Sequence, residues 1–255
     1  MGNFFPRWTN ILPIKLVIAA MFVGAGAVLA VSYYWTPKQG RQGYMPEQPI
    51  PFDHSLHAGQ LGMDCRYCHT YVEQSTHSNI PTAQTCMNCH QSVKTESEKL
   101  APLREAVETG EPIKWVEVHH VPDYAYFNHQ VHVNRGVSCH SCHGKVNEMP
   151  VVYHHETQSM SWCLDCHRAP ENKLRPLNEV TNLDWVPGDT DREGFYESLI
   201  GHGGMTLEDW HNFAEAEGAK KGFTPEGALT QKEIGTLLKE AWGVNPPESC
   251  AACHR

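Results

Sequence analysis

The hydrophobic positions of this chain are concentrated in one segment near the N-terminus. Residues 16–31 are all apolar or small, and the flanking positions extend the run to about 20–24 residues, enough for a helix to cross a bilayer. Residues 33–35 are aromatic and Trp8 precedes the run, as in the aromatic belts of membrane interfaces. The pattern predicts one transmembrane helix within residues 1–35.

A cleaved signal peptide is the alternative for this segment, because Ala25-Gly-Ala27 and Val28-Leu-Ala30 have the small residues of a cleavage site. The apolar run is longer than the core of a usual signal peptide, so we expect an uncleaved anchor. No cysteine follows the run at the position of a lipid acceptor, which excludes a lipoprotein anchor.

The charges around the run favour a cytoplasmic N-terminus. Arg7 and Lys15 precede its apolar centre, and no acidic residue does. The bias is weak, because Lys38 and Arg41 follow the run.

Hydrophobic periodicity is weaker after residue 36, where proline, glycine and turn sequences are frequent. Residues 231–242 follow a capping-box sequence and have helical spacing of apolar side chains, which predicts an amphipathic helix. A second helix is predicted to begin at Thr206, with Trp210 and Phe213 facing inward. Residues 91–109 have the pattern of a short polar helix.

Composition narrows the possible classes of protein. The formal net charge is −9, which argues against a nucleic-acid partner because no basic face could be large. The hydrophobic share of 40% and the charged share of 19% exclude a disordered chain and a polytopic membrane protein. The unusual feature of the composition is its content of 10 cysteines and 17 histidines. The cysteines could form disulfides, zinc sites or haem attachment sites, and their positions decide between these.

All ten cysteines lie in five copies of the motif CxxCH. This motif is the signature of c-type haem attachment, in which two thiols add to the haem vinyl groups and the histidine binds the iron. Neither a zinc site nor a redox-active disulfide would need a histidine after every second cysteine. The sequence therefore predicts five covalently bound haem c groups. The predicted attachment residues are Cys65, Cys68, Cys86, Cys89, Cys139, Cys142, Cys163, Cys166, Cys250 and Cys253, and the predicted proximal iron ligands are His69, His90, His143, His167 and His254.

Haem attachment to CxxCH takes place outside the cytoplasmic membrane. We therefore expect a single-pass protein of the bacterial cytoplasmic membrane, with its haem-binding part in the periplasm.

The chain also contains an internal repeat. Residues 52–57 read Phe-Asp-His-Ser-Leu-His, and residues 127–132 read Phe-Asn-His-Gln-Val-His. Gly62 and Gly136 each stand three residues before the next CxxCH motif. The two histidine pairs are offset by 75 residues, so the sequence predicts two tandem units of two haems each and a fifth haem on a different C-terminal segment.

A second axial ligand would close each iron and make the haem an electron carrier. Two histidines three residues apart in a helical turn can reach two different haems. A further histidine lies in the segment Trp115–Asp123, just before the second pair. The predicted distal ligands are His54, His57, His119, His129 and His132, with His120, Met149 and Met160 as alternatives. A methionine ligand would raise the potential of its haem.

The predicted fold is a multihaem cytochrome c, mostly helix and loop with little sheet, whose core is built on stacked haems and which has one N-terminal transmembrane helix. The predicted divisions are an anchor at 1–35, dihaem units at 36–110 and 111–170, and a C-terminal helical segment with the fifth haem at 171–255. The C-terminal helices would either cover the last haem or form a docking surface for a partner subunit.

The chain resembles the pentahaem cytochrome c subunit of alternative complex III, a bacterial quinol-oxidising complex. The resemblance covers the N-terminal anchor and most of the haem region, and residues 186–230 match least. The matching segments are 52–57 with 61–65, 115–132, 149–153, 160–168 and 250–255. The duplicated units are also similar to small multihaem cytochromes of the c3 and c7 type.

The resemblance implies partners and a direction of electron flow. Electrons from quinol would pass through iron–sulfur clusters of a neighbouring subunit of a membrane complex and then through these haems. The acceptor would be a soluble cytochrome c, a high-potential iron–sulfur protein or a terminal oxidase. The first alternative is a stand-alone membrane quinol dehydrogenase of the NapC/NirT kind, whose haem motifs usually start closer to the anchor. The second is a multihaem enzyme, which would need an open iron position.

Overall fold

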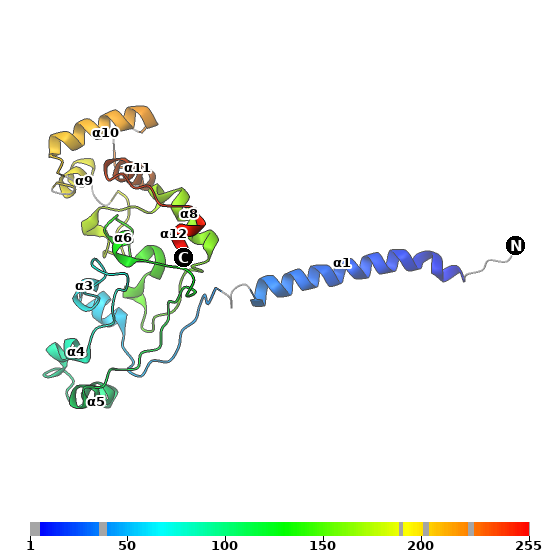
Figure 1. Ribbon diagram of the computed structural model, residues 1–255, viewed down its shortest axis with the longest axis horizontal. Coiled ribbons are helices and arrows are strands. Elements are labelled where there is room, and N and C mark those ends of the chain that lie inside the picture. Colours follow the sequence, from blue (N-terminus) through cyan, green and yellow to red (C-terminus); the bar gives the residue numbers. More distant parts are fainter. Residues whose placement is uncertain (1–5, 36–39, 189–190, 201–203, 224–226, 255) are drawn as a thin grey trace. The chain divides into compact units, whose positions relative to one another are not determined.

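The computed structural model describes residues 6–35, 40–188, 191–200, 204–223 and 227–254 (Figure 1). The chain divides into two compact units, Met1–Gln42 and Gly43–Arg255. Lys38 and the side chain of Arg7, which entered the expected membrane orientation, lie outside the described residues.

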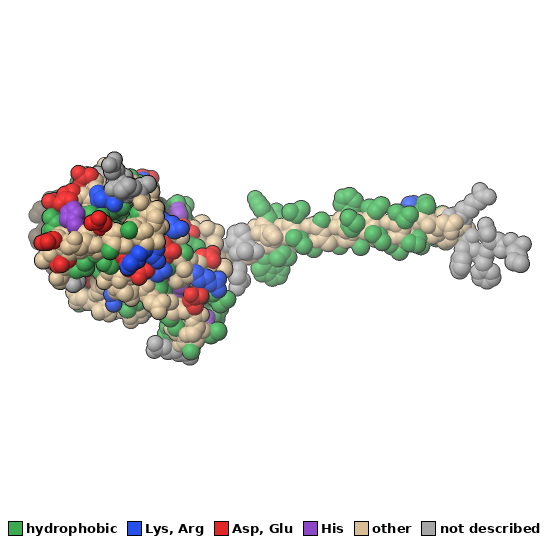
Figure 2. All heavy atoms as spheres, turned by 90° about the horizontal axis from the view of Figure 1, so that it is seen from above, with side chains coloured by type: hydrophobic (Ala, Val, Ile, Leu, Met, Phe, Trp, Pro, Cys, Tyr) green, Lys and Arg blue, Asp and Glu red, His purple; other side chains and the backbone are tan. Residues whose placement is uncertain are grey.

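The first unit contains the predicted apolar helix, which is confirmed. Helix α1 (Leu12–Ala30) begins after the 3-10 turn η1 (Arg7–Ile11) and continues into the π-helical turn η2 (Val31–Trp35). Pro13 occupies the first turn of α1, where its missing N–H costs no helical hydrogen bond. Together Trp8–Trp35 form a helix of 28 residues with mean hydropathy 2.4, long and apolar enough to cross a membrane. Hydrophobic side chains line it along its length (Figure 2).

The second unit consists of short helices joined by long loops, as the sequence predicts. Its described residues contain no strand, and one isolated bridge joins Val137 to Leu174. The helices up to the fourth CxxCH motif are η3 (Ser55–Gln60), α3 (Cys65–Cys68), α4 (Ala83–His90), η4 (Glu98–Leu100), α5 (Ala101–Thr109), α6 (His129–Val133), α7 (His140–His143), η5 (Val146–Glu148) and α8 (Met160–Arg168). The later ones are η6 (Pro170–Asn172), η7 (Leu177–Glu179), α9 (Arg192–Ser198), α10 (Leu207–Lys221), α11 (Gln231–Ala241) and α12 (Cys250–Cys253).

Helices α9, α10 and α11 build a hydrophobic core of their own. The predicted helix starts are confirmed, because Thr206 and Thr230 each close a complete capping box. Trp210 is fully buried, and Phe213 packs against the same cluster. The apolar faces of these helices pack on one another and on the segment from Leu174 to Trp185. They form a core of protein side chains beside the haem motifs. The sequence had predicted only a core built on stacked haems.

The predicted helix over 91–109 is shorter than expected. Helix α5 begins at Ala101, after the single turn η4. Lys94 has a left-handed backbone conformation with φ of 55°, which ends any helix there. Pro102 lies in the first turn of α5, the position that proline tolerates best. The residues before Glu98 therefore form turns.

Gly235 of α11 provides a test of this core. A Cβ at this position would overlap the backbone carbonyl of Glu171 in η6. We expect Gly235→Ala to lower the free energy of unfolding by about 1–3 kcal/mol through overpacking. Chemical denaturation followed by circular dichroism measures the change.

The matched control is Gly218→Ala in α10, where the added Cβ would meet Phe223 at 3.5 Å, an ordinary contact. This variant should gain up to about 1 kcal/mol from the higher helix propensity of alanine. Equal stability of the two variants would contradict the packing of α11 on η6.

Candidate haem-binding sites

Each CxxCH motif adopts one helical turn. The backbone N–H of His69 donates to the Cys65 carbonyl at 2.9 Å, and His143 and Cys139 make the same bond at 2.9 Å. Residues three apart in a helix lie on one face, so the two thiols of a motif point to the same side. All ten cysteines are described, and none forms a disulfide. The motifs therefore present thiol pairs in the arrangement that haem attachment needs.

Four of the five motif histidines are tied to backbone carbonyls through Nδ1. Their partners are Asn79 O for His69 at 2.7 Å, Val93 O for His90 at 3.0 Å, Pro247 O for His167 at 2.7 Å and Tyr124 O for His254 at 2.9 Å. A carbonyl oxygen can only accept, so Nδ1 carries the proton and Nε2 keeps its lone pair. A second hydrogen bond of this kind is the usual way to orient an iron-binding imidazole.

The two copies of the repeat have the same side-chain geometry. Phe52 stacks on His57 with ring centroids 4.3 Å apart and meets His54 edge-on at 4.7 Å. Phe127 stacks on His132 at 4.6 Å and meets His129 edge-on at 4.8 Å. The phenyl ring in each copy thus holds both imidazoles of its pair. The sequence did not lead us to assign these phenylalanines a role. Their presence at the same position in both copies of the repeat could have indicated one.

The second histidine of each pair is also tied through Nδ1. His57 donates to Asp53 O at 2.8 Å, and His132 donates to Asn128 O at 2.7 Å, in each case four residues earlier. The first histidines differ between the copies. His129 Nδ1 donates to Thr76 O at 2.9 Å, whereas the buried Nδ1 of His54 has no hydrogen-bond partner among the described residues.

Three predicted distal histidines face a motif histidine. The ring centroids are 6.4 Å apart for His57 and His90, 6.4 Å for His129 and His143, and 6.1 Å for His132 and His167. Two imidazoles on opposite faces of one iron have ring centres about 6 Å apart, because each metal–nitrogen bond is about 2 Å long. All three separations fit one iron between two imidazoles.

Burial lowers the pKa of four of the candidate iron ligands, His54, His129, His132 and His143. Burial and then the nearby His69 lower the pKa of His54 to about 4. Burial likewise lowers the pKa of His129 and of His132. Burial and then His119 lower the pKa of His143 well below its usual value. An imidazole must be unprotonated to bind a metal, so these rings are suited to do so at neutral pH.

His119 also lies beside His143. Its ring centroid is 4.3 Å from that of His143 and 4.9 Å from that of His154. His154 is 1% exposed, and its backbone bonds Gly43 and Tyr44. Sequence reasoning assigned His154 no role. The available signal was the consecutive pair of histidines between the third and fourth motifs.

The alternative distal ligands occupy different environments. His120 lies between Glu117 and Asp123, with its ring nitrogens 3.2 Å and 3.4 Å from their carboxylates. Met149 is buried and lines a cavity of about 560 Å³ beside the third motif. Met160 is the first residue of α8, and it is 68% exposed. Of the three, His120 has the environment of a surface ion pair.

Two families of known proteins match this chain. Residues 32–120 match the class III cytochrome c family, and residues 125–184 match the family of cytochrome c7 and related cytochrome c. The first match contains the first two CxxCH motifs, and the second contains the third and fourth. The chain therefore has a multihaem cytochrome c fold and is similar over these two segments to the class III and c7 cytochromes, whose haem c is bound covalently.

A named protein is also similar to this chain. The chain is 29% identical over 193 residues to the menaquinone reductase, multihaem cytochrome c subunit, of Nitratidesulfovibrio vulgaris strain Hildenborough. The alignment covers 75% of this chain and 77% of that subunit. The chain is thus similar, over most of its length, to a multihaem cytochrome subunit that is named for a quinone reductase.

Proposed function

We propose that the chain is a membrane-anchored pentahaem cytochrome c, one subunit of a quinone-linked respiratory or photosynthetic complex. All five CxxCH motifs bind haem. The apolar helix spans the bacterial cytoplasmic membrane once, with the N-terminus in the cytoplasm, and Gly43–Arg255 lies in the periplasm. The chain transfers electrons and has no catalytic residue of its own.

The observation that carries this proposal is the pairing of histidines across the motifs. His57, His129 and His132 each face a motif histidine at the separation expected for one six-coordinate iron. A closed iron has no position for a substrate, which suits an electron carrier and not a reductase. The pairing supports His57 as the partner of His90, His129 of His143 and His132 of His167.

The irons of the first and fifth motifs are assigned from other contacts. The ring of His54 lies near His69, which favours it as the partner of the first motif. Met160 is three residues before Cys163 and so on the same face of α8, and the Cys163 thiol neighbours Cys253. This favours Met160 as the partner of His254, whereas the ring of His119 lies against those of His143 and His154.

The proposed partners follow from the resemblance to alternative complex III. They are a membrane subunit that oxidises quinol, an iron–sulfur protein that passes electrons to this chain, and a soluble periplasmic acceptor. The relative in Nitratidesulfovibrio vulgaris is named for reduction of menaquinone, which is the opposite direction. A multihaem subunit between a membrane quinone pool and a periplasmic redox partner can carry electrons in either direction.

Gentle detergent extraction of the native membrane tests the proposal. We expect the chain to co-purify with a polytopic membrane subunit and an iron–sulfur protein. The purified complex should oxidise a quinol analogue, and the chain alone should not. Quinol oxidation by the chain without partners would support a stand-alone quinol dehydrogenase instead. A complex that only reduces menaquinone would reverse the proposed direction.

A further inference from the structure

The two halves of the haem region meet at the first and third CxxCH motifs. Val72, which follows the first motif, packs in a small buried cluster with Val133 and Val180, and Cys139 of the third motif packs against this cluster. The backbone N–H groups of residues 129 and 130 donate to the carbonyls of residues 76 and 75 at 3.1 and 3.2 Å. The motif helices are thus held together at this junction.

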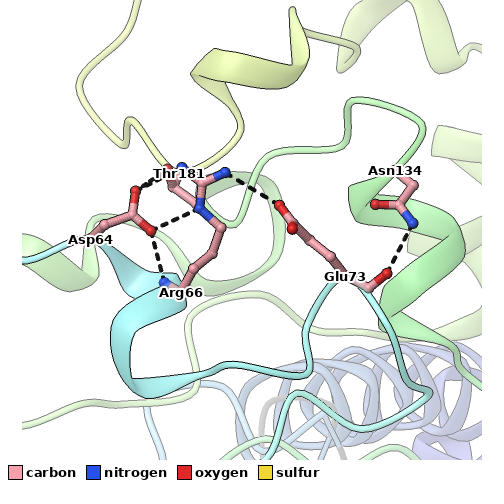
Figure 3. Close-up of polar contacts among 5 residues, drawn as sticks. All are labelled: Asp64, Arg66, Glu73, Asn134 and Thr181. Carbon is pink, nitrogen blue, oxygen red and sulfur yellow. Dashed lines mark hydrogen bonds and ion pairs between the residues drawn. The ribbon is translucent and has the colours of Figure 1, made fainter.

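A polar network surrounds the same junction (Figure 3). Asp64 accepts hydrogen bonds from the backbone N–H of Arg66 at 2.8 Å and from its guanidinium at 2.9 and 3.0 Å. The second carboxylate oxygen of Asp64 also accepts from the hydroxyl of Thr181 at 2.9 Å. Arg66 reaches Glu73 at 3.3 Å, and the Glu73 carbonyl accepts from the Asn134 amide at 3.0 Å.

Thr181 connects this network to the third motif. Its neighbour Val180 accepts hydrogen bonds from the Cys139 N–H at 3.2 Å and from the Ser138 hydroxyl at 2.9 Å. Ser138 is completely buried. Asp64, which precedes the first motif, is therefore linked to the start of the third motif through one hydroxyl and one buried backbone carbonyl.

The second motif adjoins the first. The Asn88 side-chain amide, inside the second motif, donates to the Tyr67 hydroxyl, inside the first, at 3.1 Å. The histidine pair of the first copy spans the same two motifs, because His57 faces His90 and His54 lies near His69. The second motif is thus placed at one end of the series, as far as its described neighbours show.

The fourth motif adjoins both the third and the fifth. The second histidine pair spans the third and fourth motifs, because His129 faces His143 and His132 faces His167. His167 in turn bonds the carbonyl of Pro247, three residues before the fifth motif, and Arg168 pairs with Glu248 at 3.3 Å.

We propose that the five haem-binding motifs stand in one series in the order second, first, third, fourth, fifth, and that electrons would cross between the halves where the first motif meets the third, beside Val72 and the Thr181–Asp64 hydrogen bond. This inference rests on the proposed function, because it requires all five motifs to carry haem. Each transfer moves one electron, so one haem is oxidised and its neighbour is reduced, and no proton or other reactant is needed. Asp64, Arg66 and Thr181 are positioning residues that set the distance of this crossing.

A structure of the haem-loaded complex in detergent tests the order directly. We expect the iron of the second motif to have the first iron as its nearest neighbour, and the first iron to be next to the third. A second iron that lies closest to the third would overturn the proposed order. A complex with fewer than five haems would contradict the proposed function instead, so the two failures are distinguishable.

Thr181→Val in the full chain tests the positioning role. The variant keeps the shape of the side chain but removes its hydrogen bond to Asp64. Electron transfer between the halves should slow several-fold, while the haem content and the spectra stay unchanged. The facing imidazole planes meet at 9°, 59° and 36°, so freeze-quench EPR after flash reduction can resolve the haems and follow the redistribution.

The matched control is Thr236→Val in α11, where the hydroxyl bonds only the Lys232 carbonyl of its own helix. This variant should transfer electrons at the rate of the unmodified chain. Equal rates in Thr181→Val and Thr236→Val would overturn the positioning role of the network. Should Thr181→Val fail to fold, Asp64→Asn replaces it, because it weakens the contact with Arg66 at the same junction.

Discussion

Replacing His132 with alanine is expected to convert one of the haems from low spin to high spin. The His132 ring lies 6.1 Å from that of His167, and its Nδ1 donates to Asn128 O, so Nε2 is available to the iron. Without this ligand the iron of the fourth motif becomes five-coordinate and can bind water. EPR and visible spectroscopy should show a new high-spin signal that accounts for one haem.

The haem count separates loss of a ligand from loss of structure. Covalent attachment depends on the cysteines, so His132→Ala should keep every haem that the unmodified chain carries. His57→Ala should produce the same change at the second motif, because the two copies share their geometry. The control is His211→Ala, since His211 bonds Glu193 on the surface at 3.0 Å. An unchanged spectrum in His132→Ala would remove that residue from the ligands.

Replacing both Cys250 and Cys253 with alanine is expected to remove one haem and leave the rest. These cysteines form α12, which contacts the body through Tyr126 N–H to Cys253 O at 2.8 Å and through His254 to Tyr124 O. The hydrophobic core of α9–α11 lies outside this contact, so the chain should still fold. Intact mass spectrometry should find five haems before the change and four after it.

The control keeps both cysteines. Ala251→Ser with Ala252→Ser changes only the two positions between them and should retain five haems, because attachment needs the thiols and the histidine. A mass of four haems in the unmodified chain would contradict the pentahaem proposal. A stained-gel assay for covalent haem gives the same count independently.

The helix starts in the C-terminal segment could be predicted from the sequence alone. Thr206 and Thr230 predicted two helix starts, and both form complete capping boxes. A capping box depends only on residues three positions apart, so sequence is sufficient to find it. The start of α5 was misjudged, because the left-handed turn at Lys94 has no glycine or asparagine to indicate it.

The histidine sites likewise depend partly on local and partly on long-range information. The candidate proximal histidines could be named from the sequence, because each directly follows its cysteine pair. Their Nδ1 partners could not, since Pro247 is 80 residues from His167 and Tyr124 is 130 residues from His254. The burial of His154 likewise depends on the segment at Tyr44, far away along the chain.

The sequence by itself determined the cofactor chemistry, the duplication and the apolar helix, because each is written in consecutive residues or in a fixed short spacing. Only the tertiary structure decided which imidazoles face each other and which motifs adjoin. The hydrogen bond from Thr181 to Asp64 joins residues that no local pattern relates. Such contacts depend on how loops and small cores bring separate segments together, and that information is spread over the whole chain.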